Sequence, residues 1–98
     1  MQMDIDAIHK ALANPMRRQI LAWLKEPERS FPEQVHPHSF GVCAGQIDRK
    51  AALSQSTVSA HLSTLLKAGL ITSHRVGQWN YFKRDEAVIQ AFIDQMQL

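Results

Sequence analysis

The stretch from Leu53 to Leu70 reads LSQSTVSAHLSTLLKAGL and predicts a short helix with two different faces. Ser54 is a good N-cap because its hydroxyl can accept a hydrogen bond from a free amide of the first turn. Gly69 can adopt the left-handed conformation that ends a helix. At about 100° per residue, apolar residues gather on one side; they are Val58, Leu62, Leu65 and Leu66. The other side is polar and holds Ser56, Thr57, Ala60, Ser63, Thr64 and Lys67, with Ser59 and His61 on the borders.

The segment before this helix helps to decide what its polar face is for. A slim face with many short hydrogen-bonding groups fits a DNA major groove, although a solvated surface helix explains the same pattern. Residues 44–52 predict another short helix with Ile47 on its inner side, and residues 53–54 join the two. Two short helices with so tight a joint indicate a helix-turn-helix.

A predicted hairpin follows the second helix. The β-prone segments 70–75 and 78–83 flank Val76-Gly77, which is typical of two strands joined by a tight turn. A hairpin at this place is the wing of a winged helix-turn-helix. The polar residues expected near its tip are Arg75, Gln78 and Asn80.

The net charge of +2 is unevenly distributed along the chain. Residues 1–42 are neutral, residues 85–98 carry −3, and residues 43–84 carry six basic side chains against one acidic one, a net charge of +5. The basic segment coincides with the helix-turn-helix and the wing. Because phosphate contacts supply most non-specific affinity for nucleic acid, this distribution favours double-stranded DNA as the partner.

Composition and motifs exclude several other classes of protein. Ninety-eight residues suit one domain, and no apolar run approaches the roughly 20 residues that cross a bilayer. The N-terminus lacks the features of a signal peptide, so we expect a cytoplasmic protein with no membrane partner. No Gly-rich phosphate loop or Ser-His-Asp pattern is present, so we expect no enzyme. One cysteine excludes an internal disulfide and a multi-cysteine zinc site.

Three further helices are predicted from apolar residues at helical spacing: residues 4–12, residues 15–25, and a last helix from residue 84 or 85 to about residue 97. Asn14 and Pro15 suit the N-cap and the first position of the second of these. Arg17 and Arg18 lie in its first turn, where the helix dipole disfavours cations. Solvation or ion pairing, contact with phosphate, and contact with a second subunit each explain that placement.

Residues 27–42 carry three prolines and predict a long connection without secondary structure. Phe31, Val35 and Phe40 suggest that it folds back onto the body. The apolar stripe of the last helix is rich for so small a domain, and it predicts contact with a symmetry mate.

The expected fold is mainly α with a small β-hairpin (α+β), a winged helix-turn-helix of five helices plus wing in a two-fold dimer. The expected organisation is one DNA-binding domain over residues 1–98, with dimerisation helices at 1–13 and 84–98, the helix-turn-helix at 44–67 and the wing at 70–83.

In these features the sequence resembles the ArsR family of bacterial winged-helix repressors. The resemblance covers nearly the whole chain except residues 27–42. It is carried by residues 11–21 (ALANPMRRQIL), 53–62 (LSQSTVSAHL) and 68–71 (AGLI), and by a wing with Gly77 before Trp79, Tyr81 and Phe82. It implies a homodimer built from the first and last helices, with the second helix-turn-helix helix in consecutive major grooves of a palindromic operator. It also implies wings near the flanking minor grooves, and repression that an effector relieves.

The resemblance also implies which residues contact DNA. Base readers are expected at the start of the second helix, phosphate or base-edge contacts further along it, and wing contacts at the hairpin. In that order the residues are Gln55, Ser56 and Thr57; Ser59 and His61; and Arg75 and Gln78. Ser54, the N-cap, is also counted among the expected DNA-binding residues. Many relatives carry an arginine where this chain has Ala60, so a bidentate guanine contact is missing here. For His61 a satisfied border histidine is the alternative.

The resemblance does not extend to the effector site. Arsenic- and cadmium-responsive relatives bind metal with Cys-Val-Cys-Asp, where this chain has Cys43-Ala44-Gly45-Gln46, and zinc-responsive relatives use histidines on the last helix, where it has none. We therefore predict no cofactor, and the effector stays open. One alternative is a zinc or copper site at His36, His38 and Cys43. Another is a redox or electrophile switch at Cys43, which a buried structural role for this small side chain would exclude.

The alternative to DNA binding is a winged helix that serves only as a protein-interaction module, since the fold also occurs in that role. Such a module would present an acidic or apolar outer face on its second helix. Here that face is rich in hydroxyl groups and has basic flanks. The sequence therefore favours a sequence-specific DNA-binding transcriptional regulator that acts as a homodimeric repressor.

Overall fold

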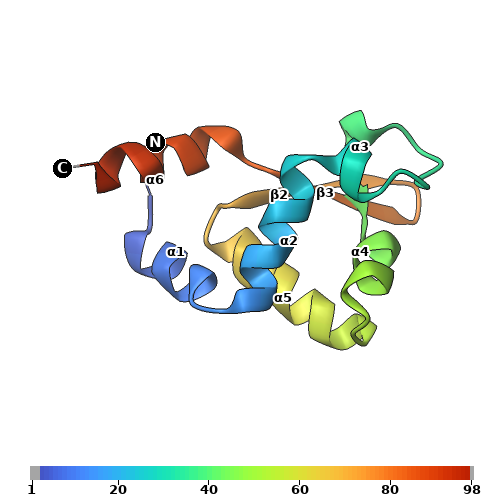
Figure 1. Ribbon diagram of the computed structural model, residues 1–98, viewed down its shortest axis with the longest axis horizontal. Coiled ribbons are helices and arrows are strands. Elements are labelled where there is room, and N and C mark those ends of the chain that lie inside the picture. Colours follow the sequence, from blue (N-terminus) through green and yellow to red (C-terminus); the bar gives the residue numbers. More distant parts are fainter. Residues whose placement is uncertain (1–2, 98) are drawn as a thin grey trace.

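Six α-helices, one 3-10 turn and three strands follow one another along residues 3–97, the part of the chain that the computed structural model describes (Figure 1). In chain order they are α1 (Ile5–Leu12), α2 (Pro15–Lys25), α3 (Pro27–Ser30), η1 (His38–Phe40), β1 (Val42–Cys43), α4 (Ala44–Ala51), α5 (Gln55–Lys67), β2 (Ile71–Val76), β3 (Trp79–Arg84) and α6 (Glu86–Met96). The predicted class, mainly α with a small β part, is confirmed. Residues 1, 2 and 98, at the ends of the predicted dimerisation segments, lie outside the described residues.

Four of the helices begin where a side chain can accept a hydrogen bond from a first-turn amide. The capping residues are Asp4, Asn14, Ser54 and Asp85. Each such cap is typically worth about 1 kcal/mol, because it satisfies an amide that has no partner inside the helix. The N-caps predicted at Asn14 and Ser54 are confirmed.

The end of α5 also follows from its sequence. The Leu70 amide donates to the Leu65 carbonyl at 3.1 Å, and the Gly69 amide donates to the Leu66 carbonyl at 2.9 Å. Gly69 has a φ of +78°. This pair of hydrogen bonds is a Schellman motif, which satisfies the last carbonyls of the helix and turns the chain away from its axis. The wing therefore begins within a few residues of α5.

The hydrophobic core lies between the inner face of α5 and its neighbours. The fully or almost fully buried residues include Ile8 of α1, Ile20 of α2, Ile47 of α4, and Val58, Leu62 and Leu65 of α5. Each side chain of this size contributes about 1.5–3 kcal/mol when it leaves water. The predicted inner faces of α4 and α5 are therefore confirmed. No helix within residues 3–97 has the length and hydropathy that spanning a membrane requires.

The wing is part of a three-stranded antiparallel sheet with the order β1-β3-β2. Val76 pairs with Trp79, so the loop between β2 and β3 is Gly77-Gln78, one residue later than the Val76-Gly77 turn expected from the sequence. Gly77 has a φ of +60°, a conformation that glycine adopts at low cost at the first position of a two-residue hairpin loop. The strand β1 was not predicted, because two residues are too few to show a period.

The segment 27–42 is more ordered than its sequence indicated. Pro27 starts the one-turn helix α3, and η1 and β1 follow, so the prediction of a connection without secondary structure is wrong and the helix count rises from five to six. Two hydrogen bonds of the Gln34 side-chain amide hold the loop, to the His36 and Gly41 carbonyls at 3.1 and 3.0 Å. Its side-chain oxygen accepts from the Cys43 amide at 2.9 Å.

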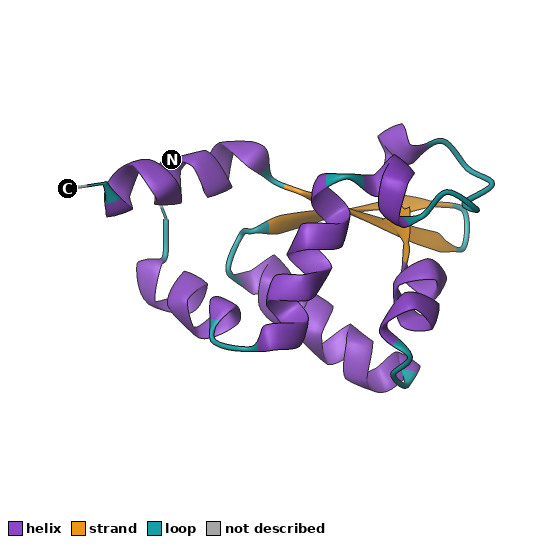
Figure 2. Ribbon diagram, in the orientation of Figure 1, coloured by secondary structure: helices purple, strands orange, loops and turns teal. Residues whose placement is uncertain are grey.

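Two of the three apolar residues of this segment fold back as predicted. Phe31 is buried and lies edge-on against Trp23, and Phe40 lies edge-on against Tyr81. Val35 is 92% exposed, so its predicted packing is wrong. The Gln34 side chain, which hydrogen-bonds the backbone of His36, Gly41 and Cys43, fixes the loop in a conformation that leaves the neighbouring Val35 outward. Figure 2 shows this loop beside the hairpin at one end of the molecule, with α1 and α6 at the other.

Substitution of Gly41 by alanine should destabilise the fold, because β1 lies so close to β3. Gly41 has a φ of +101°, and a Cβ atom there would lie 2.7 Å from the Phe82 carbonyl oxygen. We expect Gly41→Ala to lower the free energy of unfolding by about 1–3 kcal/mol, measured by urea denaturation. Gly45→Ala is the matched control, since Gly45 lies in α4 and no atom lies within 4 Å of its added Cβ. It should raise stability by up to about 1 kcal/mol, and an equal loss in both variants would contradict the β1–β3 packing.

Candidate nucleic-acid interface

The outer face of α5 is the polar surface that the sequence predicted. Its exposed residues include Gln55, Ser56, Thr57, Ser59, Ala60 and Lys67. Because the opposite face of the same helix is buried, α5 cannot rotate about its axis without exposing core side chains. The polar groups are therefore held outward at helical spacing, and a groove could be read by them without any rearrangement of the fold.

The first turn of α5 separates structural hydroxyls from available polar groups. The Ser54 hydroxyl accepts from the Thr57 amide at 3.2 Å and lies 2.8 Å from the Thr57 hydroxyl and 3.3 Å from that of Ser56. The contacts between Ser54 and Thr57 start the helix, whereas the Ser56 side chain stays exposed on the outer face. The Gln55 side chain makes no hydrogen bond within residues 3–97, so its carbonyl oxygen and amino group are both available to a base edge.

The two arginines at the start of α2 have partners within the chain. Arg17 donates to the carbonyls of Ala11 and Lys10 at 2.7 and 2.9 Å, and Arg18 donates to the carbonyl of Leu12 at 2.6 Å. These carbonyls end α1, where the unpaired oxygens carry partial negative charge. The sequence suggested solvation or ion pairing, phosphate contact or subunit contact for these arginines. None of these expectations included capping of α1. Two arginines five and six residues after Leu12, the last residue of the preceding helix, could have indicated it.

His61 lies on the border of α5, half-buried, and contacts α2. Its Nδ1 atom is 3.3 Å from the Nη1 atom of Arg17. Burial lowers the pKa of His61 and the positive charge of Arg17 lowers it further. One ring nitrogen of His61, Nδ1, therefore has a partner within the chain, as expected for a border histidine. Its second nitrogen is not engaged by any side chain or carbonyl of residues 3–97.

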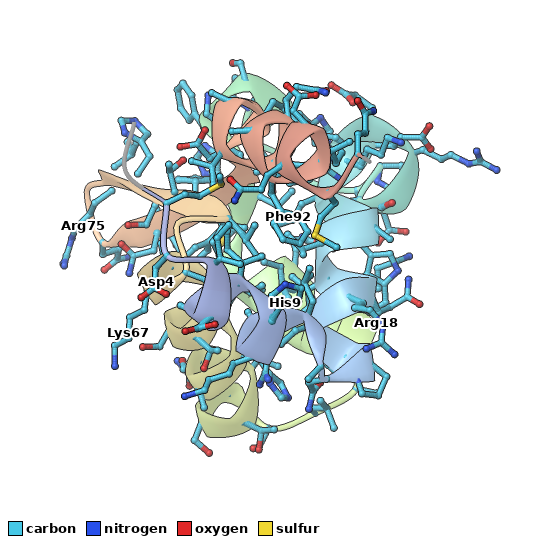
Figure 3. All side chains as sticks on the ribbon, turned by 90° about the vertical axis from the view of Figure 1, so that its left-hand side faces the viewer. Asp4, His9, Arg18, Lys67, Arg75 and Phe92 are labelled. Carbon is cyan, nitrogen blue, oxygen red and sulfur yellow. The ribbon has the colours of Figure 1, made fainter. Side chains whose placement is uncertain are left out.

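The wing presents its predicted residues at an exposed tip. Arg75 and Gln78 are exposed, and the Arg75 Nε atom donates to the Gly77 carbonyl at 3.0 Å. Trp79 and Val76, which pair across the loop, are 47% and 37% exposed. Val76 was expected in the turn, and it instead ends β2 beside the turn. Figure 3 shows Lys67 of α5 and Arg75 of the wing projecting from the same side of the molecule, with Arg18 on the opposite side.

The basic excess of residues 43–84 is partly neutralised within the chain. Arg84 makes a bidentate contact with Glu86, at 2.8 and 3.0 Å, and Lys50 lies over the rings of Trp23 and Phe31 at 5.5 and 5.7 Å. Lys83 reaches the Ser39 carbonyl at 3.4 Å. Four exposed cations of this segment make no ion pair or ring contact within residues 3–97 and are left for a polyanion: Arg49, Lys67, Arg75 and Lys83.

The residues considered for metal binding do not form one site. His38 hydrogen-bonds the Phe31 carbonyl at 2.8 Å, and the His36 ring lies edge-on against Tyr81 with centroids 5.6 Å apart. Cys43 is half-buried at the start of α4. Over the described residues, 3–97, no three His, Cys, Asp or Glu side chains gather closely enough to hold a metal ion.

Cys43 instead lies beside Tyr81, its pairing partner in the sheet. The Tyr81 side chain is fully buried and its hydroxyl has no hydrogen-bond partner within residues 3–97. Burial raises the pKa of Tyr81, and the neighbouring Cys43 raises it further. A thiol and a buried hydroxyl therefore share one end of the wing sheet.

Curated relatives of the chain include two transcriptional regulators of Bacillus subtilis. The chain is 47% identical over 94 residues to the uncharacterized HTH-type transcriptional regulator YbzH of Bacillus subtilis, which covers 94% of both chains. It is 32% identical over 89 residues to the transcriptional repressor SdpR of the same organism, covering 91% of this chain and 84% of SdpR.

Solved structures agree with the fold. The homodimeric winged helix-turn-helix DNA-binding domain of Mb0332 from Mycobacterium bovis, a possible ArsR-family regulator, matches with a TM-score of 0.68 at 26% identity, over 93% of this chain and 73% of that one. NolR from Sinorhizobium fredii matches with a TM-score of 0.65 at 28% identity, over 92% and 78%.

The family description "Bacterial regulatory protein, arsR family" matches residues 42–73, which span β1, α4, α5 and the start of β2. These residues hold the helix-turn-helix and its polar outer face. The chain is therefore a DNA-binding winged-helix transcriptional regulator and not an enzyme. It belongs to the ArsR family of bacterial helix-turn-helix regulators.

Proposed function

We propose that this protein is a repressor that binds a palindromic operator as a homodimer. In the proposal, the outer face of α5 enters the major groove, with Gln55 and Ser56 as the leading base readers and Ser59 beside the backbone. Arg75 and Gln78 of the wing contact the flanking DNA. The observation that carries the proposal is the exposed amide-and-hydroxyl face of α5, held outward by a buried inner face and bordered by Lys67 and Arg75 on the same side of the molecule (Figure 3).

The proposed dimer surface lies at the end of the molecule formed by α1 and α6. None of the α6 side chains is fully buried, and Ile93 and Met96 are 44% and 53% exposed. In Figure 3, which faces this end, Phe92 of α6 and His9 of α1 point toward each other, and their rings lie edge-on with centroids 5.5 Å apart. An apolar face that one chain leaves half-covered is what a two-fold contact buries. The similar Mb0332 domain is homodimeric.

A repressor is favoured over an activator by likeness to SdpR, a transcriptional repressor. The rival function, a protein-interaction module without DNA binding, finds little support on α5. Its exposed face carries no acidic residue and no large apolar side chain. Membership of a DNA-binding family argues in the same direction.

Gln55→Ala should relax sequence preference, whereas Arg75→Ala should weaken binding to all sequences alike. Loss of a base-edge contact removes about 1–3 kcal/mol of discrimination at one base pair. Loss of a phosphate contact lowers the slope of log affinity against log salt by about one. The measurement is selection of bound DNA from random duplexes, followed by salt titration of the selected operator.

Gln19→Ala is the matched control for Gln55, because Gln19 is an exposed glutamine on α2 and belongs neither to the outer face of α5 nor to the wing. It should change neither affinity nor preference. If wild-type protein bound no duplex at low salt, DNA reading by α5 would be ruled out, and the interaction module would be favoured. If Gln55→Ala kept the wild-type preference, the base-reading role of Gln55 would be wrong.

Ile93→Glu should convert the dimer to a monomer, because it places a charge in the proposed apolar contact. Its fold should persist, since Ile93 is already 44% exposed in the single chain. We expect operator affinity to fall at least tenfold, because two half-sites no longer bind together. Sedimentation measures the mass and circular dichroism the fold. Gln95→Glu, on the exposed side of the same helix, adds the same charge and should stay dimeric; a dimeric Ile93→Glu would refute this surface.

We propose that oxidation of the Cys43 thiol is the signal that releases the protein from its operator DNA. Hydrogen peroxide would convert the thiol to a sulfenic acid and release water, and the added oxygen would offer the buried Tyr81 hydroxyl an acceptor. This change would act on the joint between the sheet and α4. We expect peroxide to release operator DNA from the wild type but not from Cys43→Ser, measured by fluorescence anisotropy. Equal release in both proteins would show that Cys43 is not the switch.

A further inference from the structure

The Arg17 guanidinium joins three helices. It projects from the first turn of α2, and its Nε and Nη2 atoms donate to the carbonyls of Ala11 and Lys10 at the end of α1. Its remaining terminal nitrogen, Nη1, lies 3.3 Å from the Nδ1 atom of His61 on α5. All three contacts are within hydrogen-bonding distance, so the planar group is fixed at both ends.

Arg18 provides an internal comparison. It follows Arg17 in the same turn, carries the same charge and also donates to a carbonyl at the end of α1, that of Leu12, at 2.6 Å. Its side chain is exposed and makes no hydrogen bond or ion pair with α5 among the described residues. Capping of α1 is therefore shared by two arginines, and the connection to α5 belongs to Arg17.

The contact with Arg17 determines the chemical state of the His61 ring. Arginine is charged at all relevant pH values and has only donor hydrogens, so Nδ1 of His61 must be the acceptor. The ring is then neutral and carries its hydrogen on Nε2, because a neutral imidazole has one donor and one acceptor nitrogen. Protonation would place a donor opposite a donor and a second positive charge beside the first. Burial and the Arg17 charge lower the pKa of His61 in agreement with this geometry.

We propose that Arg17 is a positioning residue for DNA binding, which orients His61 with its Nε2–H directed outward as a hydrogen-bond donor and ties α5 to the end of α1. The proposal rests on the proposed function, in which His61 borders the DNA-reading face. The backbone phosphates offer the acceptors that an outward N–H on this border requires. In the proposal Arg17 acts through His61 and not by contacting DNA, since three of its five N–H groups are directed to α1 and His61.

A first test concerns the protein without DNA. Nitrogen-15 NMR of the histidine rings should show neutral His61 with its hydrogen on Nε2 in the wild type and in Arg18→Met. In Arg17→Met the two neutral forms should mix, and the pKa of His61 should rise, because the acceptor contact and the nearby charge are both removed. An unchanged His61 ring in Arg17→Met would overturn the proposal, whatever the DNA results.

The same shift has a consequence for stability. The pKa of folded His61 lies below that of the unfolded chain, so the unfolded chain binds more protons between the two values, and stability falls as pH drops through that range. Arg17→Met should make this fall less steep, and Arg18→Met should not. Arg17→Lys keeps the charge with a single donor group, and thermal denaturation of all three variants shows whether each remains folded.

A second test uses operator DNA and a double-mutant cycle of Arg17→Met with His61→Ala. Each single substitution should weaken binding about tenfold, and the double variant should be no weaker than about tenfold, because both remove one coupled contact. Arg18→Met should stay within about twofold of the wild type. A hundredfold loss in the double variant would show that Arg17 acts independently of His61 and would refute the proposal. If wild-type protein bound no DNA while the NMR result held, the failure would lie with the proposed function and not with the Arg17–His61 contact.

Discussion

Burial of one face of α5 is the constraint on which the rest of this structure depends. Val58, Leu62 and Leu65 are inserted into a core that α1, α2, α4 and the wing strands also line. Because a helix repeats about every 3.6 residues, fixing that face fixes the direction of every polar side chain on the other. The Schellman turn at Gly69 then starts β2 without a linker, so the wing is placed relative to the reading face by the same core.

Helix ends form a second layer of organisation. α1 is short and would be marginal alone, and its last carbonyls are satisfied by Arg17 and Arg18 of the next helix. Through His61 the first of these arginines also reaches α5. The helix proposed to contact a second subunit and the helix proposed to contact DNA thus share one guanidinium. In the proposed dimer, Arg17 would therefore connect the subunit contact with the two α5 helices and with the distance between them.

Electrostatics shows how folding changes the meaning of a charge count. Residues 43–84 carry a net charge of +5, yet Arg84 pairs with Glu86 and Lys50 lies over two aromatic rings. The field available to a polyanion comes from fewer cations, of which Lys67 and Arg75 project from one side (Figure 3).

Folding also changes how Cys43 is interpreted. Its position in the chain suggested a metal site with two histidines, but the loop that carries those histidines uses one for a backbone hydrogen bond and packs the other on Tyr81.

The amino-acid sequence by itself determined the helix-turn-helix, the other long helices, the wing and the polar outer face of α5, because caps, glycine stops and apolar periods act within about a dozen residues. Only the tertiary structure decided the order in residues 27–42, the strand β1 and the exposure of Val35. These depend on hydrogen bonds and packing between segments whose sequences show no period. It also decided the partners of Arg17 and the state of His61, since the two residues are 44 positions apart and meet only when α2 and α5 pack together.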